Sequence, residues 1–174
     1  MPRIILILFC ILALNACATL TEPGRIYHGA VCDIRDKNLN PAFMELRFLI
    51  RDYPKTPYAK DARFAIAEYF FIKNDYYDAL REFAAIQEDF PNSPHALFAK
   101  AVAYKIISQH GRKDIKELSS KIKKEFFDKP VVLVFSEYKT KSLKTLWGSC
   151  YAIKDYVDRV EILKDNEIFL KITP

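Results

Sequence analysis

Histidine and cysteine are the side chains with which this chain could most readily do chemistry. The three histidines, His28, His95 and His110, stand far apart, so no two of them have the i, i+4 spacing of a helical metal site. The sequence also contains no C-x-x-C, H-E-x-x-H, phosphate-binding loop or G-x-S-x-G motif. We therefore expect a protein without catalytic residues, without a bound metal and without a cofactor.

The composition indicates a folded domain, and no catalytic or metal-binding motif identifies what this domain does. The chain has 174 residues, of which 51% are hydrophobic and 28% charged, and its formal net charge is +5. These values exclude intrinsic disorder, a collagen-like fibre and a protein with several membrane spans. The function must then be inferred from the segments into which the chain is organised.

The N-terminus predicts export. A short positive start, Met1-Pro2-Arg3, precedes an almost unbroken apolar run over residues 4–14. This run has eleven residues, whereas a membrane-spanning helix needs about twenty. A positive start, a short apolar stretch and small residues after it are typical of a secretory signal peptide.

The end of this segment, Leu14-Asn15-Ala16-Cys17, resembles the lipobox of bacterial lipoproteins. The resemblance implies that Cys17 carries the lipid and that the signal peptide, residues 1–16, is cleaved between Ala16 and Cys17. Ala18 follows where an Asp would retain the protein in the inner membrane. We therefore expect an outer-membrane protein that faces the periplasm, is anchored by the acyl chains on Cys17, and has a linker up to residue 38.

Two cysteines remain in the mature chain, Cys32 and Cys150. Two thiols in an oxidising compartment could form a disulfide, or each could be a small apolar residue in the core. The sequence leaves both interpretations open.

The middle of the chain repeats itself with a spacing of 37 residues. Asp-Tyr-Pro-Lys-Thr-Pro-Tyr-Ala at 52–59 recurs as Asp-Phe-Pro-Asn-Ser-Pro-His-Ala at 89–96. In each copy the first proline ends a helix, the hydroxyl residue (Thr56 or Ser93) can cap the next helix, and the second proline suits its first position. Asn74-Asp75 marks a further helix boundary by the same reasoning.

Between these boundaries the apolar spacing is helical. Residues 76–90 present one buried face at i, i+3, i+4 and i+7, and similar patterns predict helices near 40–53, 57–73 and 94–110. Antiparallel helix pairs with this period are typical of tetratricopeptide repeats, and Ala79, Phe83 and Pro91 match that repeat. We expect an all-α fold with about two and a half such repeats over residues 39–111.

The repeat sequences, Tyr-Pro-x-Thr-Pro-Tyr-Ala and Asp-Tyr-Tyr-Asp-Ala-Leu-x-x-Phe, resemble those of a narrower group. They are similar to the lipoprotein of the outer-membrane β-barrel assembly machinery and to the periplasmic coordinator associated with the Tol system. The resemblance covers residues 40–110 and the lipobox. It implies an envelope lipoprotein that binds other envelope proteins.

Aromatic residues concentrate in the repeats, where residues 43–90 hold twelve of the chain's twenty-four. Some of them could line a groove for a partner segment, although most would pack between helices. Adjacent aromatic residues cannot all face one core, which makes Tyr58, Tyr76 and Tyr77 the best candidates for partner contacts.

The C-terminal part, residues 112–174, combines a basic segment with an apolar seam. Residues 112–144 contain ten Lys or Arg against five acids, which suits either a solvated helix face or an anionic membrane surface. Residues 131–135 could form a strand or a helix. A 3-4 spacing predicts a heptad helix through Leu143, Leu146, Cys150, Ile153, Val157 and Val160.

Together these observations predict a non-catalytic, lipid-anchored adaptor that binds envelope proteins, and the resemblance implies a role as an accessory to outer-membrane protein assembly. The alternative is a structural lipoprotein that forms homodimers through the heptad helix. Export excludes nucleic acid as the partner of the basic segment.

Overall fold

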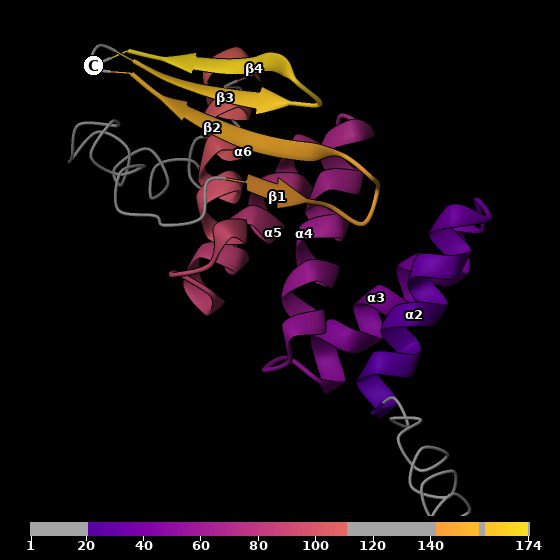
Figure 1. The fold of residues 1–174 in the computed structure, drawn as a ribbon. Coiled ribbons are helices and arrows are strands. Elements are labelled where there is room, and N and C mark those ends of the chain that lie inside the picture. Colours follow the sequence, from indigo (N-terminus) through magenta and orange to yellow (C-terminus); the bar gives the residue numbers. More distant parts are fainter. Residues whose placement is uncertain (1–20, 111–141, 157–158, 174) are drawn as a thin grey trace, which may run out of the picture.

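A computed structural model describes residues 21–110, 142–156 and 159–173. Its helices are α2 (Glu22–Arg35), α3 (Leu39–Asp52), α4 (Pro57–Ile72), α5 (Tyr76–Asp89) and α6 (Pro94–His110). Each helix packs against the next one along the chain, and α2, α4 and α6 also contact one another in that order. The described helices therefore form a stack of antiparallel pairs (Figure 1).

The two copies of the repeated motif adopt the same local structure. Oγ1 of Thr56 accepts a hydrogen bond from N of Ala59 at 3.3 Å, and Oγ of Ser93 accepts one from N of Ala96 at 3.2 Å. Each hydroxyl also donates to a carbonyl three residues earlier, at 2.8 Å and 2.7 Å. The predicted helix caps are thus confirmed, and so is the helical period that they delimit.

The boundary at Asn74-Asp75 is also confirmed. Asn74 has a positive φ of 60°, a conformation that Asn tolerates better than most residues. The side chain of Asp75 then caps α5 by accepting a hydrogen bond from N of Asp78 at 3.4 Å. The chain reverses here in the three residues between Ile72 and Tyr76, which brings α5 back along α4.

The predicted linker differs from the structure, because residues 22–35 form helix α2. Pro23 lies in the first turn, where a missing N–H costs nothing, and Ala30 is fully buried against the neighbouring helices. The helix pairs consequently begin at Glu22, and α2–α3, α4–α5 and α6 amount to two and a half pairs. The sequence interpretation assigned these residues to the linker, although Ile26, Ala30 and Ile34 have the i, i+4 spacing of a helical face.

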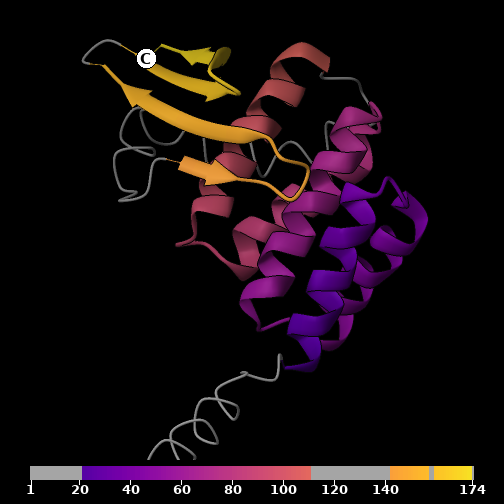
Figure 2. The same ribbon diagram turned by 45° about the vertical axis from the view of Figure 1, so that its right-hand side comes forward.

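The described residues from Ser142 to Ile172 contain a four-stranded antiparallel sheet, so the prediction of a purely all-α fold is wrong. The strands are β1 (Ser142–Lys144), β2 (Cys150–Asp155), β3 (Val160–Lys164) and β4 (Glu167–Ile172), and they pair in chain order. The register aligns Tyr151 with both Leu143 and Lys164. Figure 2 shows the sheet lying across the helices rather than beside them.

The heptad helix predicted over 143–160 is therefore also wrong. Its described seam residues divide between the strands and the turn before β2, and Cys150 is exposed rather than in a core. Gly148, within the predicted helix, has a φ of +87°, a turn conformation that a continuous helix does not contain. The dimer that depended on this helix loses its structural basis.

Two clusters of buried residues hold the molecule together. The larger one lies between α4, α5, α6 and the sheet, and its largest fully buried side chains are Phe64, Phe83, Phe98 and Tyr151. The smaller one joins α2, α3 and α4 around Leu46, Leu49 and Ile66. The sheet thus shares its core with the helices.

Several predicted features lie outside the described residues. These are the cleavage and lipidation positions Ala16 and Cys17, the basic segment up to residue 141 with the stretch 131–135, and Val157 of the apolar seam.

Candidate functional site

The sheet covers part of the face that α4 and α6 present. The ring of Tyr151 in β2 packs on Phe64 of α4 at 6.0 Å between centroids and on Phe98 of α6 at 5.6 Å. Phe169 of β4 packs on Phe71 near the end of α4 at 6.0 Å. In each helix these contacts lie further along than Tyr58 and Asp61 of α4 and His95 of α6.

A buried carboxylate joins the sheet to α4. Glu68 has no exposed surface, and its Oε1 accepts a hydrogen bond from the hydroxyl of Tyr151 at 3.0 Å and an ion pair from Nζ of Lys164 at 3.2 Å. Burial, and then the charge of Glu68, raises the pKa of Tyr151 far above its ordinary value. Tyr151 therefore stays protonated and keeps donating, which holds the sheet in one position.

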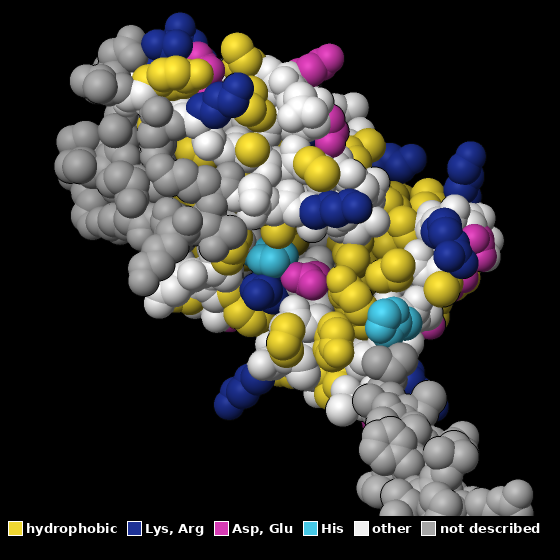
Figure 3. Space-filling view, in the orientation of Figure 1, with side chains coloured by type: hydrophobic (Ala, Val, Ile, Leu, Met, Phe, Trp, Pro, Cys, Tyr) yellow, Lys and Arg dark blue, Asp and Glu magenta, His cyan; other side chains and the backbone are white. Residues whose placement is uncertain are grey.

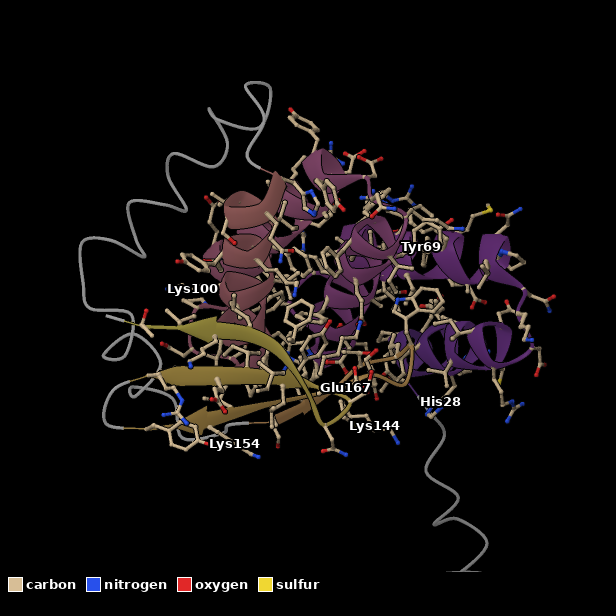
Figure 4. The ribbon with its side chains drawn as sticks, turned by 90° about the horizontal axis from the view of Figure 1, so that it is seen from above. His28, Tyr69, Lys100, Lys144, Lys154 and Glu167 are labelled. Atoms are coloured by element: carbon tan, nitrogen blue, oxygen red, sulfur yellow. The ribbon has the colours of Figure 1, made fainter. Side chains whose placement is uncertain are left out.

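The turn between β1 and β2 extends the covered area toward α2. Nε1 of Trp147 donates a 2.7 Å hydrogen bond to the carbonyl oxygen of Ala65. Leu146 and Trp147 pack against the cluster that joins α2, α3 and α4, and the indole lies 5.9 Å from the ring of Tyr69. Figure 4 looks down on this arrangement, with Tyr69 on the helices and Lys144 and Lys154 on the side of the sheet turned away from them.

Near their N-terminal ends, α4 and α6 meet α2 at a polar group. Oδ2 of Asp61 accepts a hydrogen bond from the hydroxyl of Tyr27 at 3.2 Å, and Oδ1 lies 2.8 Å from Nε2 of His95. The three residues belong to α2, α4 and α6, so one carboxylate connects the first helix of each successive pair. The side chain of Asp61 remains 32% exposed, which leaves it open to a partner.

Two tyrosine rings lie beside this carboxylate. The rings of Tyr27 and Tyr58 are 4.9 Å apart and tilted by 41°. Burial, and then the charge of Asp61, raises the pKa of Tyr27 well above its ordinary value, so its hydroxyl remains a donor. Figure 3 shows acidic and histidine side chains next to a broad hydrophobic area on this side of the molecule. We call Tyr27, Tyr58, Asp61 and His95 the Asp61 site.

The structure does not bring the three predicted contact tyrosines together. Tyr58 belongs to the Asp61 site at the start of α4, whereas Tyr76 and Tyr77 begin α5, beyond the other end of that helix. An α-helix rises about 1.5 Å per residue, so some 20 Å or more separates Tyr58 from the other two. Tyr76 stacks on His110 at 4.2 Å, and Tyr77 is 52% exposed.

Both cysteines of the described residues, Cys32 and Cys150, are free and exposed. Cys32 lies in α2, and Cys150 begins β2 on the outer side of the sheet. The structure contains no disulfide between them. Neither cysteine belongs to the Asp61 site.

A second open apolar surface lies on α3. Met44 is 72% exposed and Phe48 is also exposed, and with Phe43, Ile50 and two arginines they line a shallow groove of about 570 Å³. The arginines, Arg47 and Arg51, are paired with Glu82 and Asp52. This surface is the main rival of the Asp61 site for a protein partner.

The sequence interpretation identified one residue of the Asp61 site as a contact residue, Tyr58, and excluded His95 as a metal ligand because of its spacing from the other histidines. The signal that could have found the others is their separation, because Tyr27, Asp61 and His95 follow one another at intervals of 34 residues. Equal intervals close to one repeat length place residues on neighbouring helices of a stack.

Comparison with protein-family models, curated proteins and solved structures finds no match for this chain. No helix in the described part is long and apolar enough to cross a bilayer. The described residues also contain no group of three or more His, Cys, Asp or Glu placed to hold a metal ion.

Proposed function

We propose that this protein is a lipid-anchored adaptor of the bacterial envelope that binds a segment of another envelope protein at the Asp61 site. The stack would be a short, divergent form of the tetratricopeptide repeat, with α2, α4 and α6 as the first helices of its pairs. The partner segment would lie across these three helices, below the sheet.

One observation carries this proposal. The first helices of three successive pairs place together a carboxylate that is 32% exposed, two partly exposed tyrosine rings and a buried histidine. Tyrosine gives a large contact area and a polar end for little loss of conformational freedom, which suits a binding surface. The lipobox-like Leu14-Asn15-Ala16-Cys17 supports the anchor.

The anchor and the surface would work together. Acyl chains on Cys17 would hold the protein at the membrane, where its effective concentration toward an envelope partner is high. A modest contact at the Asp61 site would then suffice for a stable complex. The most fitting role is that of an accessory to outer-membrane protein assembly, as the repeat resemblance implies.

Photo-crosslinking in cells tests the proposed surface. A photoreactive phenylalanine replaces Tyr58 in one strain, and Met44 on α3 or Ile168 on β4 in two others, because both control side chains are well exposed. We expect Tyr58 to trap a defined envelope protein that neither control traps. Crosslinks from Met44 and not from Tyr58 would place the partner on α3 and contradict the proposal.

The anchor has a separate test. Cys17→Ser should abolish labelling by palmitate and leave the signal peptide uncleaved, while Cys10→Ser should change neither. Unchanged labelling of the Cys17→Ser protein would contradict a lipid on that residue.

A further inference from the structure

Asp61 differs from the buried carboxylates of the helices in the type of side chain that it pairs with. Glu68 is paired with Lys164, and Glu82 with Arg47 and Arg63. Among the described residues, Asp61 lies 2.8 Å from Nε2 of His95 and forms no ion pair with Lys or Arg. Within that part of the chain, this partly buried carboxylate therefore has no permanently charged partner.

The bonds that Asp61 does form leave room for a ligand. A carboxylate offers about four lone-pair positions, and Tyr27 and His95 use one on each oxygen. Tyr27 donates as a neutral hydroxyl, so its bond orients the carboxylate without removing the negative charge. His95 is almost fully buried, and its Nδ1 has no hydrogen-bond partner within the described residues. The polar group is thus incomplete.

The neighbouring rings favour the same class of ligand. The faces of tyrosine rings attract cations, and Tyr27 and Tyr58 lie together at 4.9 Å beside the carboxylate. A basic side chain entering here would gain an ion pair and a ring contact at once. An acidic side chain would meet the charge of Asp61.

We infer that the Asp61 site takes a basic side chain, an arginine or lysine of an extended partner segment, with Asp61 as the ion-pair partner and Tyr58 as the ring beside it. This inference rests on the proposed function, since it names the chemistry of the segment bound at that same face.

The test uses the full chain purified in a non-ionic detergent and two probes, acetyl-arginine-amide and the neutral isostere acetyl-citrulline-amide. Binding is followed by NMR shifts of the Tyr27, Asp61 and His95 backbone amides. We expect the arginine probe to bind with a millimolar dissociation constant and the citrulline probe to bind at least about tenfold more weakly. Equal binding of the two probes would overturn the inference.

Variants locate the probe. Asp61→Asn should weaken the arginine probe at least about tenfold, while Asp36→Asn, an equal charge change at the exposed end of α2, should leave it unchanged. Tyr27→Phe keeps the ring and frees a lone pair of Asp61, so it should bind the probe at least as well. This variant tests the site even where Asp61→Asn fails to fold, and a loss of binding in Tyr27→Phe would contradict the inference.

The outcome is separable from that of the proposed function. If the arginine probe does not bind but Tyr58 gives a specific crosslink, the inference of a basic side chain is wrong and the proposed adaptor function stands. If the arginine probe binds but no partner is crosslinked, the inference about the Asp61 site stands and the proposed adaptor function is wrong.

Discussion

The hydroxyl of Tyr151 donates a 3.0 Å hydrogen bond to Glu68, across 83 residues of sequence. Both side chains are almost completely enclosed, and the bond joins strand β2 to helix α4. A buried carboxylate needs such donors, because its charge is otherwise poorly solvated. The bond decides which part of the helical face the sheet covers and which part stays open at Asp61.

Removing this bond should destabilise the whole molecule. Tyr151→Phe leaves Lys164 to satisfy Glu68, and we expect the free energy of unfolding to fall by about 1–3 kcal/mol. Urea denaturation measures the change. Tyr77→Phe, at an exposed ring, is the matched control and should change little. Equal stability of the two variants would mean that the sheet is not held by Glu68.

Trp147 should control how firmly the β1–β2 turn lies on α4. Trp147→Phe keeps an aromatic ring and loses the hydrogen bond to the carbonyl of Ala65, so we expect a loss of about 1 kcal/mol. Hydrogen exchange of the β1 and β2 amides should become faster, while exchange in α5 stays the same. Unchanged exchange in β1 and β2 would contradict this role.

The two helix caps should make similar contributions to the free energy of unfolding. Thr56→Ala and Ser93→Ala each remove the acceptor for a backbone N–H, so each should lower stability by about 1 kcal/mol. The two losses should add in the double variant, because the caps share no partner. Thr56→Ser and Ser93→Thr keep the hydroxyl and should retain most of the stability. A loss confined to one copy would show that the repeated motif is not equivalent in the two places.

Glu45 should make stability depend on pH. Burial, and then the charge of Asp33, raises the pKa of Glu45 above its ordinary value, so the folded protein holds this proton more tightly than the unfolded chain. The contribution of Glu45 to folding stability is complete below its pKa in the unfolded chain, about 4.3. This contribution is lost as the pH rises through the pKa of Glu45 in the folded protein. Glu45→Gln should flatten this part of the stability profile from pH 4 to 7, measured by thermal denaturation. Asp36→Asn should keep the wild-type profile.

The sheet and the heptad helix make opposite predictions for two adjacent residues. In a heptad seam Cys150 would be buried, whereas in β2 Cys150 is exposed and Tyr151 is buried. We expect Cys150→Lys to change stability by no more than about 0.5 kcal/mol and Tyr151→Lys to unfold the protein. The native thiol of Cys150 should also react readily with a thiol reagent. Tolerance of Tyr151→Lys would contradict the sheet.

The sequence by itself determined the helices from residue 39 to residue 110, because their ends depend on local interactions. Thr56, Asn74-Asp75 and Ser93 bond to backbone groups within five residues, so neighbouring residue types suffice to locate these boundaries. Helix α2 was missed because its residues were assigned to the linker, although Glu22, Pro23 and the basic end are ordinary signals of a helix and its apolar face is as pronounced as that of α3.

Only the tertiary structure decided the sheet and the Asp61 site. The 3-4 spacing of Leu143, Leu146 and Cys150 fits a helix as a pattern, and strands replace it because β2 can pair with β1 and β3 and bury Tyr151 on α4. Likewise, nothing near Asp61 in the sequence indicates Tyr27 or His95, each 34 residues away. Such contacts form only when the packed helices bring distant segments together and bury their polar groups. Interactions between residues close in sequence do not determine which distant residues meet.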